Sequence, residues 1–475
     1  MDPNQPDLPL CVDLDGTLVA TDTLWESILL LLKQNILRLF LLPIWVTLGR
    51  AAFKNKIAQY VTLEVANLPY REKVLLLLQQ EKNNGRTIIL ATAAHYTIAQ
   101  AVANHLQLFN EVIASDAHTN MKGATKRDTL IQRFGNQGYD YMGDSTADLP
   151  IFQTARRPFL VVPTPKLLKQ IQCPSEQILT VPTQYWWTLF KAIRPHQWIK
   201  NLLIFLPLLL AHQWLDMARW VDALLAFIAF SLAASAGYVL NDLVDLAADR
   251  SHPTKKYRPF AAGLLSIPTG LVLLVSLLAT SLLLSLWWLS GYFMSLVSLY
   301  LILTISYSFY LKRKLVIDVL VLAGLYAYRI LAGCVAIDVI VSSWLLAFAM
   351  FIFTSLAFLK RYIELLQLTD TNKIKHRDYE IADIEMVVSM GTASGYLAVL
   401  VLSLYINSEI VKVLYHSPFF LWLICPLLLY WISRVWFLAK RGNLPDDPLQ
   451  YALTDITSWF IAVVVLILML LAKFV

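Results

Sequence analysis

The chain has 475 residues, enough for two or three domains, and 57% of its residues are hydrophobic whereas only 15% are charged. Soluble domains carry about 25% charged residues, so this composition excludes a wholly soluble protein. The net charge of +6 does not indicate nucleic-acid binding, because no basic stripe with interleaved aromatic residues accompanies it, and the four cysteines lack the spacing of a zinc or disulfide framework.

The first part of the chain, residues 8–163, is predicted to be an α/β unit. Short apolar runs at 8–14, 87–91 and 139–142 predict buried strands, and the helical patterns between them indicate a parallel sheet. The apolar stretch 28–48 is interrupted by charged residues and Pro43, which favours a helical cap lying on the membrane over a transmembrane helix. No signal peptide precedes the unit, so we expect it in the cytosol.

Two aspartates, Asp13 and Asp15, follow the first predicted strand and lead into a turn at Gly16. Asp13 could attack a phosphorus atom, while Asp15 could protonate the leaving oxygen and then activate water. Thr92, after the second strand, could bind a phosphoryl oxygen.

Further charged residues accompany the later part of the predicted sheet. Either Lys122 or Lys126 could neutralise the charge that develops on a phosphoryl group. Asp144 and Asp148 follow the third strand, and their carboxylates suit Mg²⁺, which prefers oxygen ligands. The ends of all three predicted strands are expected at the edge of the sheet where open α/β sheets bind ligands.

This set of motifs resembles the haloacid dehalogenase-like phosphatases over residues 8–163. The resemblance implies that Asp13 is the nucleophile and Asp15 the acid/base. It also implies one lysine that neutralises the phosphoryl group, for which Lys126 is favoured and Lys122 is the alternative. It also implies that Mg²⁺ is held by Asp13, the main-chain carbonyl of Asp15, Asp144 and, in support, Asp148. We expect this domain at 1–165, with a Rossmann-like sheet and a cap at about 20–80, followed by a proline-rich linker at 166–190.

The remainder of the chain, 191–475, is predicted to be an all-α membrane domain with nine transmembrane helices. The apolar segments are about the length that a bilayer requires, and they lie at 198–214, 220–240, 264–289, 292–311, 315–340, 343–363, 386–406, 418–438 and 456–474. Lys and Arg gather after segments two, four, six and eight, while the alternate loops hold only Arg219 and Lys412. The positive-inside rule then predicts an integral protein of the cytoplasmic membrane, with the N-terminal domain and the active sites in the cytosol and the C-terminus outside.

A cluster of carboxylates ends the second apolar segment. Spacings of three and four residues put Asp242, Asp245 and Asp249 on one helical face, after Asn241. Mg²⁺ with a polyphosphate would neutralise this crowded charge, and a basic tail follows that could bind the remaining phosphate oxygens: Lys255, Lys256 and Arg258.

This motif and its basic tail resemble the UbiA superfamily of intramembrane prenyltransferases, which bind a diphosphate through Mg²⁺. The stretches 194–201, 249–259 and 307–312 look more like the decaprenyl-phosphate phosphoribosyltransferase branch. The usual second aspartate motif is not clean, because Asp370, Asp378 and Asp383 lack the DxxxD spacing, which puts a second metal site in doubt.

The resemblance places Lys200, Asn201 and Lys312 among the residues that bind substrate. Asp318 and Arg329 lie eleven positions apart on one helical face. Ionisable groups inside a membrane span are costly, so both are predicted to bind substrate.

Together these observations predict a bifunctional membrane enzyme. Asp242 and Asp245 would support transfer of phosphoribose from phosphoribosyl diphosphate to polyprenyl phosphate, and the front domain would remove the 5-phosphate of the product. One alternative is a prenyltransferase for an aromatic or other small acceptor, joined to a phosphatase with an unrelated substrate. Another is a transporter or lipid scaffold that the front domain regulates. Neither lipid chain length nor oligomeric state follows from the sequence.

Overall fold

The structure is a computed structural model that describes residues 1–475 except 1–7, 172, 180–183, 369–376 and 446. The chain divides into two compact units. Unit 1 comprises 1–194 and 238–275, and unit 2 comprises 195–237 and 276–475. The predicted domain limits, 1–165 and 191–475, stay a prediction.

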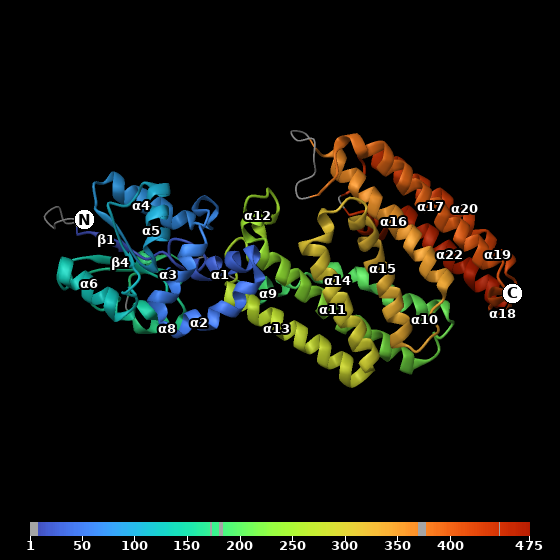
Figure 1. The fold of residues 1–475 in the computed structure, drawn as a ribbon, viewed down its shortest axis with the longest axis horizontal. Helices are drawn as coiled ribbons and strands as arrows, with labels where there is room; N and C mark the ends of the chain where they lie inside the picture. The colour runs from blue at the N-terminus through green and yellow to red at the C-terminus, as the bar shows by residue number, and fades with distance from the viewer. Residues whose placement is uncertain (1–7, 172, 180–183, 369–376, 446) are drawn as a thin grey trace. The chain divides into compact units, whose positions relative to one another are not determined.

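Unit 1 contains a six-stranded parallel sheet in the order β3-β2-β1-β4-β5-β6. The neighbouring strands β1 and β4 are labelled in Figure 1. The strands are β1 (Leu10–Val12), β2 (Ile88–His95), β3 (Glu111–Ser115), β4 (Asp140–Gly143), β5 (Pro158–Val161) and β6 (Ile178–Leu179). The predicted α/β fold is confirmed, and the three predicted strands are β1, β2 and β4, whereas β3, β5 and β6 were not predicted. β5 begins at Pro158, a position at which the missing backbone N–H is tolerated.

Helices cover this sheet, and alternate strand residues contact different layers. Leu10 and Val12 belong to one buried cluster, whereas Cys11 between them belongs to another, as the two-residue period of a strand requires. The accompanying helices of unit 1 are α4 (Glu72–Asn83), α5 (Tyr96–Leu106), α6 (Ala124–Phe134), α7 (Leu149–Phe152), α8 (Pro165–Gln170) and α9 (Tyr185–Ala192).

A helical insertion separates β1 from β2. It consists of α1 (Thr23–Gln34), the 3-10 segment η1 (Ile36–Leu41), α2 (Leu42–Thr47) and α3 (Arg50–Tyr60), and it has its own small core around Leu31 and Ile57. The stretch 28–48 is therefore three short elements and not one long helix. It also leaves large apolar side chains exposed, at Ile36, Leu37, Phe40, Ile44, Val46 and Leu48.

The helices that follow start at Pro195. They are η5 (Pro195–Phe205), α10 (Leu206–Leu210), α11 (Met217–Val244), α12 (Leu246–Arg250), η6 (Lys255–Tyr257), α13 (Ile267–Leu284), η7 (Ser285–Leu289), α14 (Gly291–Phe309), η8 (Leu311–Arg313), α15 (Ile317–Ala336), α16 (Ser343–Leu366), η9 (Ile381–Asp383), α17 (Ile384–Ile406), α18 (Glu409–Leu414), α19 (Phe419–Trp422), α20 (Ile424–Lys440), α21 (Pro448–Thr454) and α22 (Ile456–Phe474). Two of the three boundaries between the units fall inside helices α11 and α13, and the third lies between Arg194 and Pro195.

Eight helices within the described residues are long and apolar enough to cross a membrane, and they match predicted segments two to nine. The prediction of a ninth, at 198–214, is not confirmed. This segment is the 3-10 element η5 followed by the five-residue α10. Pro207 in the first turn of α10 cannot donate a backbone hydrogen bond, so a continuous α-helix through this segment is disfavoured.

In unit 2, helices α15, α16, α17 and α20 share one buried core, and α16, α17 and α20 lie side by side (Figure 1). Two glycines of α17 permit the close packing. A Cβ atom on Gly391 would lie 2.3 Å from the Trp436 ring, and one on Gly395 would lie 2.7 Å from Ile432. Small residues of this kind are typical of interfaces between membrane helices.

Candidate active sites

The carboxyl edge of the sheet in unit 1 brings three predicted aspartates together. Asp13 follows β1, and Asp144 and Asp148 follow β4, which is paired with β1. One oxygen of each carboxylate lies within 4.8 Å of the others. The pairing of β1 with β4 thus brings Asp13 close to Asp144 and Asp148, although they are more than 130 positions apart in sequence.

Lys126 lies against this cluster and is fully buried. Its Nζ is 3.0 Å from Asp13 Oδ1 and 3.5 Å from Asp148 Oδ1, and it donates a 2.9 Å hydrogen bond to the Tyr141 hydroxyl. Burial lowers the pKa of the Lys126 ammonium, but the two carboxylates outweigh this effect and the pKa is raised, so Lys126 stays charged. Lys122 lines the cavity but is exposed. The geometry favours Lys126 for the predicted lysine role.

Gly16 forms the turn that brings the β1 end close to Asp144. Its φ is +77°, and a Cβ atom there would lie 2.2 Å from Asp144 Oδ2. The Asp144 carboxylate also accepts a 3.2 Å hydrogen bond from the Thr17 hydroxyl. Only glycine meets both the backbone conformation and the close approach at position 16.

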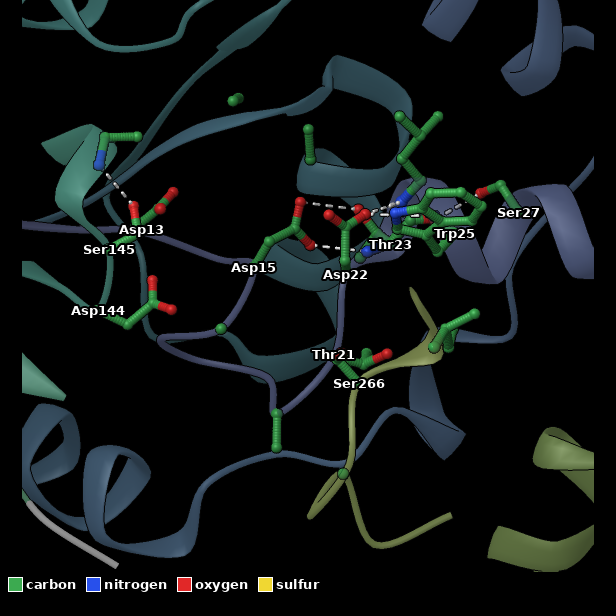
Figure 2. Close-up of a pocket in the computed structure, with 18 of the residues that line it drawn as sticks. Asp13, Asp15, Thr21, Asp22, Thr23, Trp25, Ser27, Asp144, Ser145 and Ser266 are labelled. Carbon is green, nitrogen blue, oxygen red and sulfur yellow. Dashed lines mark hydrogen bonds between the residues drawn. The ribbon is translucent and has the colours of Figure 1, made fainter. Parts of the chain in front are cut away.

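Asp15 points to the start of helix α1 (Figure 2). Its carboxylate accepts hydrogen bonds from the Thr23 backbone N–H at 2.8 Å and from the Thr23 hydroxyl at 3.3 Å. Burial, and then the charge of Asp22, raise the pKa of Asp15 to about 8. An acid with such a pKa carries its proton at neutral pH and can give it to a leaving oxygen.

Thr92 does not reach the cavity. It lies inside β2, which extends to His95, and its fully buried hydroxyl accepts a 3.0 Å hydrogen bond from the Ala94 N–H. Ala93, Ala94 and His95 line the cavity in its place.

The residues present fit a divalent cation at the sheet edge. Asp13, Asp144 and Asp148 offer the hard oxygen ligands that Mg²⁺ prefers. Burial and the charge of Asp13 raise the pKa of Asp144 to about 7, and burial also raises the pKa of Asp13 against the opposing effect of Lys126. The negative charge of this cluster is therefore incompletely compensated by the protein, which is the condition that a bound cation relieves.

The second predicted carboxylate cluster, at the end of α11, also lies in unit 1. Asp242 and Asp249 are buried, and Nη1 of Arg258 contacts both, at 3.2 and 2.6 Å. Arg194 pairs with the same oxygen of Asp242, while Asp242 Oδ2 is buried with no hydrogen-bond partner among the described residues. That oxygen is therefore available as a ligand for a cation.

Asp245 is placed differently from the other two. Its side chain is about one third exposed and pairs with Lys33 of helix α1 at 3.1 Å. Helix α11 ends at Val244 and α12 starts at Leu246, so Asp245 lies at the junction. Among the described residues, the three aspartates do not form a metal-ligand group like that of Asp13, Asp144 and Asp148. Each of the three aspartates contacts a basic side chain: Asp242 contacts Arg194 and Arg258, Asp249 contacts Arg258, and Asp245 contacts Lys33.

The neighbouring residues that were predicted to bind substrate are at least partly accessible. Lys255 and Lys256 are exposed, with the Lys256 ammonium 5.2 Å from the Tyr257 ring centroid, and Asn241 is partly buried. Arg194 was not predicted as a partner of Asp242, although it begins the stretch 194–201 that resembles the phosphoribosyltransferase branch. Its position forty-eight residues before Asp242 gave no local signal.

In unit 2, Asn201 and Arg329 are paired with each other. Arg329 Nε donates a 2.8 Å hydrogen bond to Asn201 Oδ1, and Asn201 donates to Ser231 at 2.9 Å. The Arg329 guanidinium lies over three aromatic rings, of Phe230, Tyr300 and Tyr326. These contacts support a packing role for Arg329 beside the predicted role in binding.

Asp318 is fully buried in a separate ion-pair network. It contacts Arg361 Nε at 2.7 Å and Arg377 Nη1 at 2.9 Å, and it accepts a 2.8 Å hydrogen bond from the Tyr379 hydroxyl. Arg361, itself fully buried, also pairs with Glu364. The sequence reading missed this network, although a buried arginine in a membrane span is a recognisable signal.

The remaining predicted residues of unit 2 lie elsewhere. Lys200 pairs with Asp447 at 2.7 Å, and Lys312 lies in η8. Of the aspartates that occur where the superfamily has its second motif, Asp378 and Asp383 are described, whereas Asp370 lies outside the described residues.

The chain belongs to the UbiA prenyltransferase family, whose sequence profile matches residues 202–461, more than half of the chain. A second profile, that of haloacid dehalogenase-like hydrolases, matches residues 10–153. The chain thus joins a hydrolase-family domain to a transferase-family membrane domain, and both predicted resemblances are confirmed. Members of both families typically depend on Mg²⁺.

Three relatives illustrate how far the similarity extends. An uncharacterized protein, y4nM, of Sinorhizobium fredii is 37% identical over 475 residues, covering 96% of this chain and 90% of the relative. Nodulation protein NoeC of Azorhizobium caulinodans is 37% identical over 273 residues, covering 57% of this chain and 88% of NoeC. Decaprenyl-phosphate phosphoribosyltransferase of Mycolicibacterium smegmatis is 39% identical over 196 residues, covering 40% of this chain and 60% of that enzyme.

Proposed function

We propose that the membrane domain transfers phosphoribose from phosphoribosyl diphosphate to a polyprenyl phosphate, and that the front domain removes the 5-phosphate from the product. The similarity to decaprenyl-phosphate phosphoribosyltransferase carries the choice of substrates for the first reaction. The sheet-edge site supports the second reaction, because Lys126 contacts Asp13, which forms a potential metal-ligand group with Asp144 and Asp148, and Asp15 lines the same cavity.

In the transferase reaction, an oxygen of the lipid phosphate attacks the anomeric carbon of phosphoribosyl diphosphate. The bond from that carbon to the diphosphate oxygen breaks, and pyrophosphate leaves with the electron pair. Arg258 and Arg194 supply positive charge beside Asp242 and Asp249, where the leaving group would be bound. Mg²⁺ bound to Asp242, Asp245 and Asp249 would neutralise the pyrophosphate oxygens.

Other basic residues complete the proposal for this reaction. The phosphates of the sugar and the lipid would be bound by four lysines, Lys255, Lys256, Lys200 and Lys312. The substrate site would be shaped by Asn201, Asn241, Asp318 and Arg329.

In the phosphatase reaction, an oxygen of Asp13 attacks the phosphorus of the 5-phosphate. The bond from phosphorus to the ribose oxygen breaks, and Asp15 gives its proton to that oxygen. Asp15 then takes a proton from water, whose oxygen attacks the aspartyl phosphate, releasing inorganic phosphate and regenerating Asp13. Lys126 holds Asp13 in position, and Mg²⁺ on Asp13, Asp144 and Asp148 would neutralise the phosphoryl oxygens.

The distribution of basic loops supports a cytosolic location for both sites. The exposed apolar side chains of η1 and α2 would then lie on the cytosolic membrane surface, where a lipid-linked product emerges.

Radiolabelled phosphoribosyl diphosphate with polyprenyl phosphate tests the first reaction, using the full chain in detergent. We expect label to enter the lipid fraction, and Asp242→Asn to abolish this. If a prenyl diphosphate is consumed and no labelled lipid forms, the alternative of a prenyltransferase for a small acceptor is correct. If nothing is turned over in either assay, the scaffold or transporter alternative is favoured.

Asp13→Asn tests the order of the two reactions. We expect this variant to keep transferase activity and to accumulate phosphorylated lipid-linked ribose, detected by mass spectrometry of lipid extracts. A fully dephosphorylated product in Asp13→Asn would refute the assigned role of the front domain.

A further inference from the structure

The cavity at the sheet edge of unit 1 has a wall that comes from outside the phosphatase sequence. The cavity has a volume of about 990 Å³ and is lined by the carboxylates of Asp13, Asp15 and Asp144. Residues 262–267 and Thr269, which follow the aspartate motif of the membrane domain, line it as well. Figure 2 shows Ser266 of this segment on the side of the cavity across from Asp13 and Asp144.

Close packing fixes this segment, here called the wall (262–269), against the loop after β1. Gly263 has a φ of +68°, and a Cβ atom there would lie 2.3 Å from the Ala20 carbonyl oxygen. The segment therefore follows the loop between Asp15 and helix α1 at backbone contact distance.

One buried arginine connects the wall to the cap. Arg250 Nη2 and Nη1 lie 2.6 and 3.2 Å from the two oxygens of Glu26 in helix α1, and both side chains are less than 10% exposed. Arg250 Nε also donates a 3.0 Å hydrogen bond to the carbonyl of Ala261, next to the wall. A bidentate, desolvated pair of this kind fixes orientation as well as proximity.

The same helix positions the acid/base residue. Thr23, one turn before Glu26, donates two hydrogen bonds to Asp15. The aspartate-motif segment and the phosphatase acid/base therefore both contact the first turn of the cap helix, the former at Glu26 and the latter at Thr23.

The lining of the cavity indicates the class of substrate. Leu264, Leu265 and Ile267 of the wall, with Trp25 and Phe53 of the cap, form an apolar part that a small sugar phosphate does not require. The lining also contains the basic residues Arg50, Lys54 and Lys122, which suit a second anionic group in addition to the phosphate held at Asp13.

From these contacts we propose that the wall is a specificity-determining part of the phosphatase site, and that it selects a phosphomonoester attached to an amphiphile through a second phosphate. The inference rests on the proposed phosphatase function. Leu264 is its most accessible apolar residue, at 43% exposed, so a substitution there changes the cavity surface and spares the core.

The test compares two ready-made probes, farnesyl-phosphoryl ribose 5-phosphate and ribose 5-phosphate, and measures phosphate release by the full chain in detergent. We expect the wild type to prefer the farnesyl probe in kcat/KM, and Leu264→Asp to lower this preference at least about tenfold, while Leu264→Met retains it. Leu76→Asp, an exposed leucine of α4 that does not line the cavity, is the matched control and should retain the preference.

The inference is overturned if the wild type shows no preference, or if Leu264→Asp leaves the preference unchanged. Because both probes are supplied ready made, the outcome does not depend on the transferase reaction. Failure to cleave either probe would instead refute the proposed phosphatase function itself.

Discussion

Lys126 offers the sharpest test of the phosphatase site. Its ammonium is the cation nearest to Asp13 and Asp148, at 3.0 and 3.5 Å, and the side chain is only 1% exposed. Lys126→Met keeps the length and the apolar stem of the side chain but removes the charge. Two buried carboxylates then lose their shared counter-charge.

Two magnitudes follow from this geometry. Removing one partner of a buried ion pair costs about 3–5 kcal/mol of stability, because the remaining charges stay desolvated. Removing one preorganised charge from a phosphoryl site lowers kcat by about 10²–10³-fold. We therefore expect faster amide hydrogen exchange in β1 and β4 and nearly complete loss of phosphate release from ribose 5-phosphate.

Lys122→Met is the matched control, because Lys122 lines the same cavity but is exposed. We expect a far smaller loss of activity in this variant than in Lys126→Met, and no change in hydrogen exchange. If Lys122→Met loses as much activity as Lys126→Met, or if Lys126→Met keeps more than about a tenth of the wild-type kcat, the assignment of Lys126 is wrong.

Three further outcomes test other parts of the structure. Gly16→Ala should abolish phosphatase activity and leave lipid labelling intact, because the added Cβ would overlap the Asp144 carboxylate; normal phosphate release would contradict this. EDTA should stop both reactions and Mg²⁺ should restore them, whereas labelling by Asp242→Asn should stay absent at any Mg²⁺ concentration. Asp318→Asn should lower stability by about 3–5 kcal/mol, seen as a lower thermal midpoint, because Arg361 loses a buried partner. An unchanged midpoint with lost labelling would favour a direct role of Asp318 in substrate binding.

Local patterns in the sequence were sufficient for the features that depend on local physics. The length and hydropathy of an apolar run decide whether a helix can cross a bilayer, and eight of the nine predicted segments are such helices. The failure at 198–214 has a local cause as well, since Pro207 disfavours a continuous helix. Likewise, a buried strand followed by an aspartate was enough to predict that Asp13 and Asp144 meet at one sheet edge.

Contacts between distant segments required the tertiary structure. The sequence left Lys122 and Lys126 open, and only the structure distinguishes them. Lys126 lies in α6 with its buried ammonium on Asp13, whereas Lys122 precedes this helix and is exposed. Glu26 and Arg250 are 224 positions apart, and neither was predicted to bind a substrate or a metal. Their pairing depends on the path of the whole intervening chain, and so does the wall that the membrane-domain sequence contributes to the phosphatase cavity. The sequence by itself determined which chemical groups the protein has, and the tertiary structure decided which of them meet.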